Sequence, residues 1–479
     1  MPRRSILTER QRSMLLDLPT DEASILHHYT LADDDIEHIR TRRHSRNRLG
    51  FALQLCAFRY PGRLLVPGEV IPLEVSRFIA AQLGEDPDDL SCYAETDVTR
   101  RRHLVDLRSI YGYRMFSGRG ARDLKAWLEH EAETARSNED LSRRFVEECR
   151  RTQTILPGVS VVERLCADAL VVAERRIDGR IVDRLDEAMR SRLDALLTEM
   201  VDGKVSRFIW LRQFEVGQNS AGASRLLDRL EFLQALGVPP AILEGVPPHR
   251  VTRLRRQGER YFADGLRDIS SDRRLAILAV CTVEWHAALA DAVVETHDRI
   301  VGKTWRDAKK ICDARITDER SALHDTLQSF RALGAALLEA KGDGASLDAA
   351  TETACGWSHL EGLVTTAAEL TDTMAADPLT HVVQGYHRFR RYAPRMLRVL
   401  EIHAAPVAEP LVQAAQIIAE GPKDGARPLG FLRRSSKWHR HLGVQAPGDH
   451  RLWEAAVLFH LREAFRSGDI WLANSRRYG

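Results

Sequence analysis

Arginine is the residue whose spacing in this sequence most clearly indicates chemistry, and that chemistry is phosphate binding. No acidic residue occurs between Glu37 and Glu69. The same window holds seven arginines, which are Arg40, Arg42, Arg43, Arg46, Arg48, Arg59 and Arg63. Uncompensated cations repel one another, and DNA phosphates relieve this repulsion while they release condensed counterions. The window therefore predicts a nucleic-acid contact, with a solvated basic helix face as the alternative.

Two helices joined by a turn are predicted to hold these arginines. Asp33 or Asp34 can cap a first helix that runs roughly from Asp34 to Thr41, and a second helix runs roughly from Asn47 to Phe58. Apolar residues at helical spacing give the second helix an inner face, formed by Leu49, Ala52, Leu53 and Cys56. Its other side is expected to carry Arg46, Asn47, Gly50 and Gln54. Arginine, asparagine and glutamine read base edges in the major groove, so the pair predicts a helix-turn-helix whose second helix is the reader.

A second basic cluster follows, and aromatic residues are interleaved with it. Its candidate DNA contacts are Arg100, Arg101, Arg102, Arg108 and Arg114. Tyr111, Tyr113 and Phe116 lie among them. Such a mixture suits phosphate gripping and base stacking, but the aromatic side chains could equally belong to a hydrophobic core.

A third cluster predicts a second reader of the same kind. Residues 218–220 can cap a helix from about Ala221 to Leu236, and a basic stretch follows it. The candidate DNA contacts of this region are Ser224, Arg225, Arg253, Arg255 and Arg256. Later arginines, such as Arg388 and Arg395, could contact further phosphates, or they could pair with acidic helices or with another subunit.

No complete catalytic or metal-binding motif accompanies the basic clusters. Neither H-E-x-x-H nor G-x-S-x-G occurs, and the stretch Ser117–Gly120 lacks the lysine of a phosphate-binding loop. The seven cysteines include no C-x-x-C pair, which favours free thiols in a reducing cytosol over a zinc ribbon or a disulfide framework. We therefore predict no catalytic residue, no metal site and no cofactor. Composition alone leaves an acidic two-metal nuclease site open, although no rigid sheet is predicted to carry it.

An all-α, multi-domain protein is predicted to position these clusters. The chain has 479 residues, which exceeds the roughly 250–300 residues of a single core. Two short apolar runs, Val159–Val162 and Ala169–Val172, continue into charged residues at helical spacing and so favour helix over strand. The chain-breaking stretch Leu156–Gly158 ends an N-terminal DNA-binding domain (1–155). A second DNA-binding region (156–285) and a further helical region (286–479) are expected to follow it.

The protein is expected to be soluble and cytoplasmic. Charged residues from Glu9 onward leave no room for the apolar region of a signal peptide. The longest charge-free apolar run near the middle of the chain, Leu275–Val283, is far shorter than the ~20 residues that span a bilayer. The net charge of +2 conceals segregated basic clusters, so nucleic acid rather than a membrane is the predicted partner.

These residues give the chain a resemblance to the transposases of class II, Tn-three-type, replicative transposons. The most specific stretches are Arg48–Cys56 with Arg59–Arg63, and Leu461–Trp471 with Ser475–Tyr478. Shorter matching stretches are Ile71–Gly84, Arg100–His103 with Gly112–Arg114, Leu156–Gly158 with Glu163–Leu165, and Arg391–Pro394. The resemblance covers essentially the whole chain.

The resemblance implies that the first two regions bind the terminal inverted repeats of a transposon and that residues 286–479 form a dimerisation or scaffold region. The expected partners are thus double-stranded DNA and a second copy of the chain. In that family a later RNase H-like domain carries a D-D-E triad and magnesium. This sequence ends at Gly479 without positions that match the triad, so it is expected to be inactive alone. The alternatives are a helical scaffold, or a truncated, repressor-like transposase that binds nucleic acid without specificity.

Overall fold

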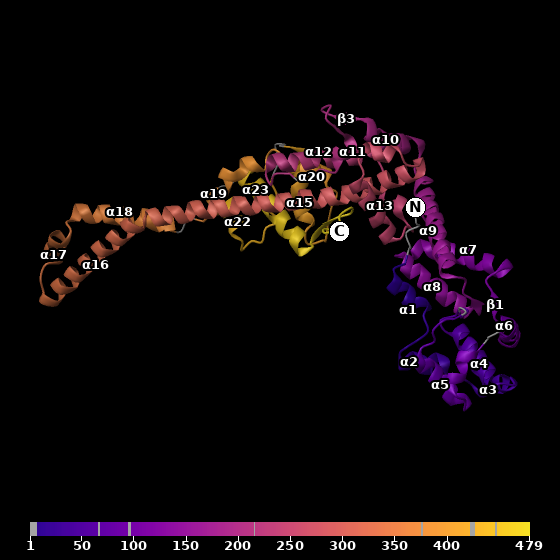
Figure 1. Cartoon of the computed structure of the whole chain (residues 1–479). Helices are drawn as coiled ribbons and strands as arrows, with labels where there is room; N and C mark the ends of the chain where they lie inside the picture. The colour runs from indigo at the N-terminus through magenta and orange to yellow at the C-terminus, as the bar shows by residue number, and fades with distance from the viewer. Residues whose placement is uncertain are drawn as a thin grey trace. The chain divides into compact units, whose positions relative to one another are not determined.

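The structure is a computed structural model that describes residues 7–65, 68–93, 97–214, 216–374, 377–421, 427–445 and 448–479 (Figure 1). Helices make up most of this described chain, and its strands are confined to three two-stranded sheets. The predicted all-α class is confirmed at this level, and both apolar runs near residue 160 lie in one helix, α9 (Val159–Val182). The chain divides into two compact units. The division into three functional domains stays a prediction.

Unit 1 consists of Met1–Arg184, Leu243–Leu254 and Ser270–Ala276. Besides α9, its helices are α1 (Glu9–Leu16), α2 (Glu22–Tyr29), α3 (Asp33–Arg40), α4 (Ser45–Arg59), α5 (Leu73–Leu83), the 3-10 helix η1 (Pro87–Cys92), α6 (Asp97–Tyr111), α7 (Gly118–Thr134) and α8 (Asn138–Arg151). Two short strands, β1 (Arg114–Met115) and β2 (Thr154–Ile155), pair in parallel. The predicted helix pair at the first arginine cluster is therefore present as α3 and α4.

Helix α4 is the centre of the first hydrophobic core of unit 1. Every residue from Leu49 to Phe58 is buried. The run is apolar on all sides except at Gln54, and such a helix is stable only when other elements surround it. Helices α2, α3, α5 and α6 and the 3-10 helix η1 supply that surrounding layer.

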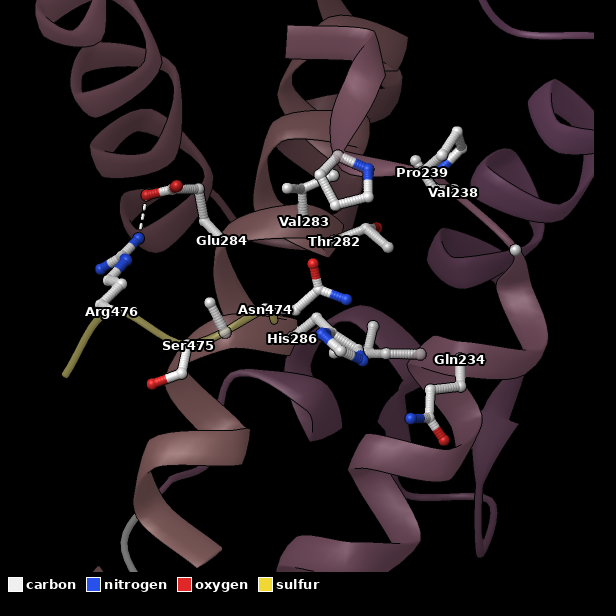
Figure 2. Close-up of a pocket in the computed structure, with 14 residues that line it drawn as sticks. Gln234, Val238, Pro239, Thr282, Val283, Glu284, His286, Asn474, Ser475 and Arg476 are labelled. Carbon is white, nitrogen blue, oxygen red and sulfur yellow. Dashed lines mark hydrogen bonds and ion pairs between the residues drawn. The ribbon is translucent and has the colours of Figure 1, made fainter. Parts of the chain in front are cut away.

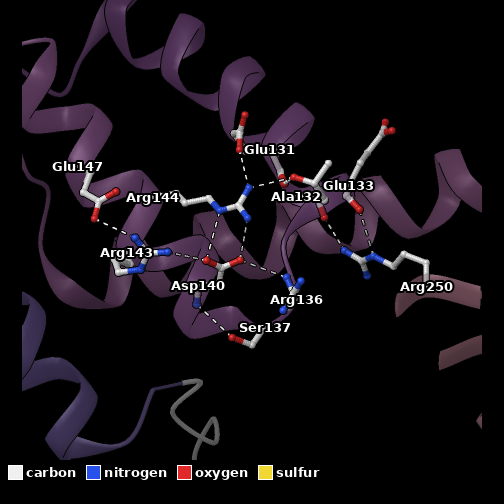
Figure 3. Close-up of polar contacts among 11 residues, drawn as sticks. Glu131, Ala132, Glu133, Arg136, Ser137, Asp140, Arg143, Arg144, Glu147 and Arg250 are labelled. Atoms are coloured by element: carbon white, nitrogen blue, oxygen red, sulfur yellow. Dashed lines mark hydrogen bonds and ion pairs between the residues drawn. The ribbon is translucent and has the colours of Figure 1, made fainter. Parts of the chain in front are cut away.

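Helices α1, α7, α8 and α9 form a second core in unit 1, and arginines fix the junction of α7 and α8 (Figure 3). Arg144 of α8 pairs with Glu131 of α7 at 2.8 Å and with Asp140 at 3.0 Å. Arg250, on α13 (Pro248–Arg260), is buried and donates to the carbonyl oxygen of Ala132 near the end of α7. A cation at the C-terminal end of a helix satisfies carbonyl groups that have no partner within the helix. Arg250 thereby attaches the first part of α13 to unit 1.

Unit 2 consists of Leu185–Ile242, Arg255–Ile269 and Ile277–Gly479. Its first elements are α10 (Glu187–Thr198), the antiparallel strands β3 (Met200–Val201) and β4 (Val205–Ser206), α11 (Arg207–Leu211), α12 (Ser220–Leu236), η2 (Pro240–Leu243) and α14 (Ala263–Arg267). The Asn219 side chain accepts a hydrogen bond from the Gly222 amide and so caps α12. The predicted start of this helix is confirmed.

The second part of unit 2 is built on one long helix, α15 (Ser271–Asp318). The elements that follow it are α16 (Arg320–Asp343), α17 (Leu347–Ala354), α18 (Trp357–Met374), α19 (Leu379–Val382), η3 (Val383–Arg388), α20 (Ala393–Val399), β5 (Ile402–Ala404), α21 (Glu409–Glu420), α22 (Lys437–Arg440), η4 (His441–Gln445), α23 (His450–Ser467) and β6 (Ile470–Leu472). Strands β5 and β6 pair antiparallel.

A buried histidine on α15 joins three segments of unit 2. The Nε2 atom of His297 lies 3.1 Å from the Leu458 carbonyl oxygen of α23, and Nδ1 lies 2.9 Å from the hydroxyl of Tyr392. Burial lowers the pKa of His297 to about 4, so the ring is neutral near pH 7 and can donate through Nε2 and accept through Nδ1. Helix α15 is long and apolar enough to cross a membrane, but 67% of its most apolar window is buried in the protein, as in a core helix.

The last residues of the chain lie against α15. Ser475 donates to Asp291 at 2.5 Å, while Arg476 and Arg477 pair with Glu284 and Glu295. This part of the final family-like motif therefore has a structural role within unit 2. Among the cysteine side chains that the structure describes, all six are free thiols, as predicted.

Candidate nucleic-acid interface

Among the described residues, four arginines of the first cluster form ion pairs with carboxylates. The pairs are Arg42 with Asp106 at 2.6 Å, Arg48 with Glu85 at 2.7 Å, Arg59 with Asp35 at 2.8 Å, and Arg63 with Glu69 at 2.5 Å. The window lacks acidic residues, but carboxylates at its edges, Asp35 and Glu69, and in later segments, Glu85 and Asp106, reach its arginines. The expectation that all seven cations are uncompensated is wrong for these four, which hold unit 1 together.

The pair of Arg59 and Asp35 is the most buried of these contacts on its acidic side. The Asp35 side chain is 3% exposed, and it also accepts a hydrogen bond from the Ala32 amide at 2.8 Å. Burial alone would raise the pKa of Asp35, but the hydrogen bonds from Arg59 and Ala32 lower it below its usual value. Asp35 therefore stays ionised, and Arg59 is needed to balance its charge.

Helix α4 cannot present the predicted reading face. Gln54 is 1% exposed, so the prediction that it projects outward is wrong. The physical reason is that Phe51, Leu55 and Phe58 make the supposed outer side as apolar as the inner side. Gly50 is also covered, because the Tyr93 ring occupies the space that a side chain would need. Helix α4 reaches the surface at its two ends: the first turn carries exposed Arg46 and half-buried Asn47, and the last residue is half-buried Arg59.

The turn between α3 and α4 and the outer side of α6 form one basic surface. The ion pair of Arg42 and Asp106 links the turn to the middle of α6. The exposed arginines of these two segments are Arg40, Arg43, Arg46, Arg101, Arg102 and Arg108. Within the described parts of the chain, no carboxylate pairs with Arg40, Arg43, Arg102 or Arg108. We call these six residues the α3–α6 surface.

The buried side of α6 carries an uncharged histidine. His103 is 4% exposed, and its Nδ1 atom lies 3.0 Å from the hydroxyl of Tyr93. Burial, helped by the nearby charge of Arg42, lowers the pKa of His103 to about 4. His103 therefore anchors α6 against α4 through an edge contact with Phe51 and adds no charge to the α3–α6 surface near neutral pH.

The rest of the second cluster divides between surface and core. Arg100 is half-buried and donates to the Leu65 carbonyl oxygen, while Arg114 is exposed on β1. The three interleaved aromatic residues, Tyr111, Tyr113 and Phe116, pack against the two cores of unit 1. Of the two interpretations of these rings, the core interpretation is the one that the contacts support.

The third cluster is more strongly engaged in the fold than its sequence indicates. The Ser224 hydroxyl donates to the Ser220 carbonyl oxygen at 3.0 Å, Arg253 pairs with Glu174 at 2.8 Å, and Arg255 pairs with Glu259 at 2.7 Å. Arg225 and Arg256 are exposed. Within the described chain these two arginines have no carboxylate partner. Arg225 and Arg256 are therefore the candidate contacts of this cluster that are exposed and have no carboxylate partner in the described chain.

Two later arginines pair with acidic helices, which was one of the alternatives for them. Arg395 of α20 binds Glu231 and Asp228 of α12, each at 2.6 Å, and Arg388 pairs with Asp307 at 2.7 Å. These contacts cover part of the outward side of α12. They reduce the α12 surface that could enter a DNA groove.

Unit 2 also contains a cavity of about 390 Å³ beside α15 (Figure 2). Glu284, His286 and Asn474 line it, but Glu284 is already paired with Arg476, and burial lowers the pKa of His286. In the portion of the chain that the structure describes, no group of three or more His, Cys, Asp or Glu side chains could hold a metal ion.

Comparison with known proteins gives a consistent result along the whole chain. Residues 6–169 match a family model described as a domain of unknown function (DUF4158). The chain is 34% identical over 484 residues to the transposase for transposon Tn3926 of Escherichia coli, covering 100% of this chain and 49% of the relative. It is 33% identical over 488 residues to the transposase for transposon Tn501 of Pseudomonas aeruginosa, with coverage of 100% and 49%. The match to the transposase for transposon Tn1546 of Enterococcus faecium is 27% over 489 residues, with coverage of 99% and 49%. The chain spans about half the length of the curated relatives it matches.

Proposed function

Because this chain belongs to the transposase family of Tn-three-type transposons, we propose that it binds the terminal inverted repeats of its transposon in a sequence-specific manner. The α3–α6 surface of unit 1 is the proposed principal contact. In this proposal the chain is a cytoplasmic DNA-binding and dimerisation segment of a replicative transposase, and a separate RNase H-like domain with magnesium cuts and joins the DNA. The chain by itself holds and positions the transposon end.

The observation that carries the proposal is the separation of the arginines into two groups. Paired arginines such as Arg59 neutralise carboxylates within unit 1. The second group remains exposed, and in the described chain no carboxylate pairs with its members, which are Arg40, Arg43, Arg102 and Arg108. These four arginines come from two segments that are about 60 residues apart in the sequence. A fold that gathers cations from distant segments without internal counterions favours a polyanion as the partner.

The exposed side of the α16–α18 hairpin supports the dimerisation part of the proposal. Helix α16 packs on α17 and α18, and this thin layer leaves Leu327, Leu338 and Val364 at 60%, 73% and 54% exposure. Large apolar side chains exposed on this helix pair are candidates for a protein contact, and a second copy of the chain is the proposed occupant. Sedimentation of the chain should show a dimer that Leu338→Glu weakens; a monomer at all concentrations would contradict this part.

Titration of the purified chain into two labelled duplexes tests the DNA-binding proposal. One duplex carries the inverted repeat that flanks the gene, and the other carries the same bases scrambled; both are measured at several salt concentrations. Tight binding to the repeat alone is expected, with a slope of log K against log salt of about −0.9 for each neutralised phosphate. Equal and weak binding to both duplexes would contradict sequence-specific recognition and favour non-specific binding.

A further inference from the structure

Helix α6 exposes apolar residues in the middle of a basic face. Val98 and Val105 are 75% and 60% exposed. With about 3.6 residues per turn, Val98, Val105 and Ser109 lie along the centre of the exposed side. Arg102 lies along one edge, and Arg101 and Arg108 lie along the other. The opposite side, which includes His103 and Leu107, is buried against the first core of unit 1.

Single exposed valines are common on protein surfaces, but the two valines of α6 lie between rows of exposed arginines on one helix face. A face that only grips phosphates needs cations and no apolar centre. The combination suits a partner that is anionic at its rim and partly apolar at its floor.

The major groove of DNA has both properties. Phosphates line its two rims, and the C5-methyl groups of thymine project from its floor, where apolar side chains contact them. The groove is about 12 Å wide and admits one α-helix. Helix α6 has 15 residues, so it is about 22 Å long at a rise of about 1.5 Å per residue, which is enough to span the groove.

We propose that α6, and not α4, is the helix that enters the major groove, and that Val105 contacts the C5-methyl group of a thymine in the inverted repeat. This inference rests on the proposed DNA-binding function and names the chemical group that is read. Arg102 and Arg108, which in the described chain have no carboxylate partner, contact the rims or guanine edges on either side. Arg42, held by Asp106 and lying over the Phe51 ring at 4.3 Å, fixes the α3–α4 turn beside α6.

The spacing of the two valines adds a constraint on the recognised sequence. Val98 and Val105 are seven residues apart on one face, a separation of about 10 Å along the helix. Successive bases of one strand are about 3.4 Å apart. The two valines therefore match methyl groups about three base pairs apart when the helix lies along the groove.

A uracil scan of the inverted repeat tests this inference. Each thymine is replaced in turn by uracil, which lacks only the methyl group, and the affinity of the full chain is measured. At one position or at two positions about three base pairs apart, binding should weaken about fourfold, the effect of exposing one buried methyl-sized group. The Val105→Ala variant should bind thymine and uracil equally at one of these positions.

The controls separate this inference from the proposed function. Val171, which is 47% exposed on α9, provides the matched variant Val171→Ala, which should keep the full sensitivity to uracil. Unfolding of both variants is measured, and neither should change, because both side chains are exposed. If the chain shows no preference for the repeat, the proposed function itself fails. Two other results would overturn the inference: tight binding to the repeat with no loss of affinity at any thymine-to-uracil replacement, or a Val105→Ala variant that still loses affinity on uracil replacement. In either case α6 is not the helix that reads the bases, and its apolar centre is a site for a protein partner.

Discussion

Replacing Arg59 by glutamine should destabilise unit 1 and leave its affinity for DNA unchanged. The guanidinium of Arg59 donates to Asp35 at 2.8 Å, and the Asp35 side chain is only 3% exposed. Removal of the cation leaves a buried carboxylate with the Ala32 amide as its remaining strong donor. Because Arg59 does not belong to the α3–α6 surface, the substitution removes an internal counterion and no proposed contact to phosphate.

The magnitude follows from the burial of the two partners. Removing one partner of a fully buried ion pair costs about 3–5 kcal/mol, whereas an exposed pair contributes about 0–1 kcal/mol. Asp35 is buried, but Arg59 is 31% exposed, and water can partly solvate the carboxylate that remains. We therefore expect a loss of about 2 kcal/mol in the free energy of unfolding, which corresponds to a decrease of about 4–8 °C in Tm for a unit of this size.

Thermal unfolding and DNA titration of the same preparation measure the two expected results. Arg40→Gln is the matched control, because Arg40 is exposed and in the described chain has no carboxylate partner. It should change the unfolding free energy by less than about 0.5 kcal/mol and should weaken DNA binding. The reverse pattern, with Arg59→Gln stable but weak in binding, would refute the separation of structural from DNA-contacting arginines.

Other expected results concern packing and pH. Gly50→Ala should destabilise unit 1 by about 1–3 kcal/mol in denaturant unfolding, because the new methyl group overlaps the Tyr93 ring. The control is Gly179→Ala on α9, where no atom lies within 4 Å of the new methyl group; it should be neutral or slightly stabilising in the same measurement. The folded-state pKa values of His103 and His297 are lowered to about 4, so the unfolded state binds more protons than the folded state between about pH 6.5 and pH 4. The free energy of unfolding should therefore decrease as the pH falls through this window, and the decrease should be smaller in His297→Gln. If the free energy of unfolding of this variant depends on pH as that of the wild type does, His297 does not have the lowered pKa.

The sequence predicts the helices better than the contacts that surround them. The α3 and α4 helices and the Asn219 cap of α12 follow from local patterns, because helical periodicity is a local property. The predicted cap of α3 by Asp33 or Asp34 is wrong, because Ala32 is the N-cap residue and its amide donates to the Asp35 side chain. The burial of α4 was predictable in part, since the run from Leu49 to Phe58 contains a single polar side chain. Assigning only one inner face to that run led to the wrong placement of Gln54.

The partners of the arginines were not predictable from the sequence. Arg42 and Asp106 are 64 positions apart, and Arg59 and Asp35 are 24 positions apart. Only tertiary packing decides which carboxylate reaches which cation, so counting charges in a window overstates the free positive charge. The exposed valines of α6 could have been noticed, because Val98 and Val105 share a helical face with the arginines while the buried residues lie opposite.

The salt dependence of DNA binding by a variant without the exposed cations shows whether the α3–α6 surface holds the DNA. In this variant Arg40, Arg43, Arg102 and Arg108 are all replaced by glutamine, and log K for the inverted-repeat duplex is measured against log salt. If the α3–α6 surface holds the DNA, the slope should become shallower by about 3–4, close to 0.9 for each lost phosphate contact, with Tm unchanged. An unchanged slope in a folded variant would contradict the account and place the DNA contact elsewhere on the chain.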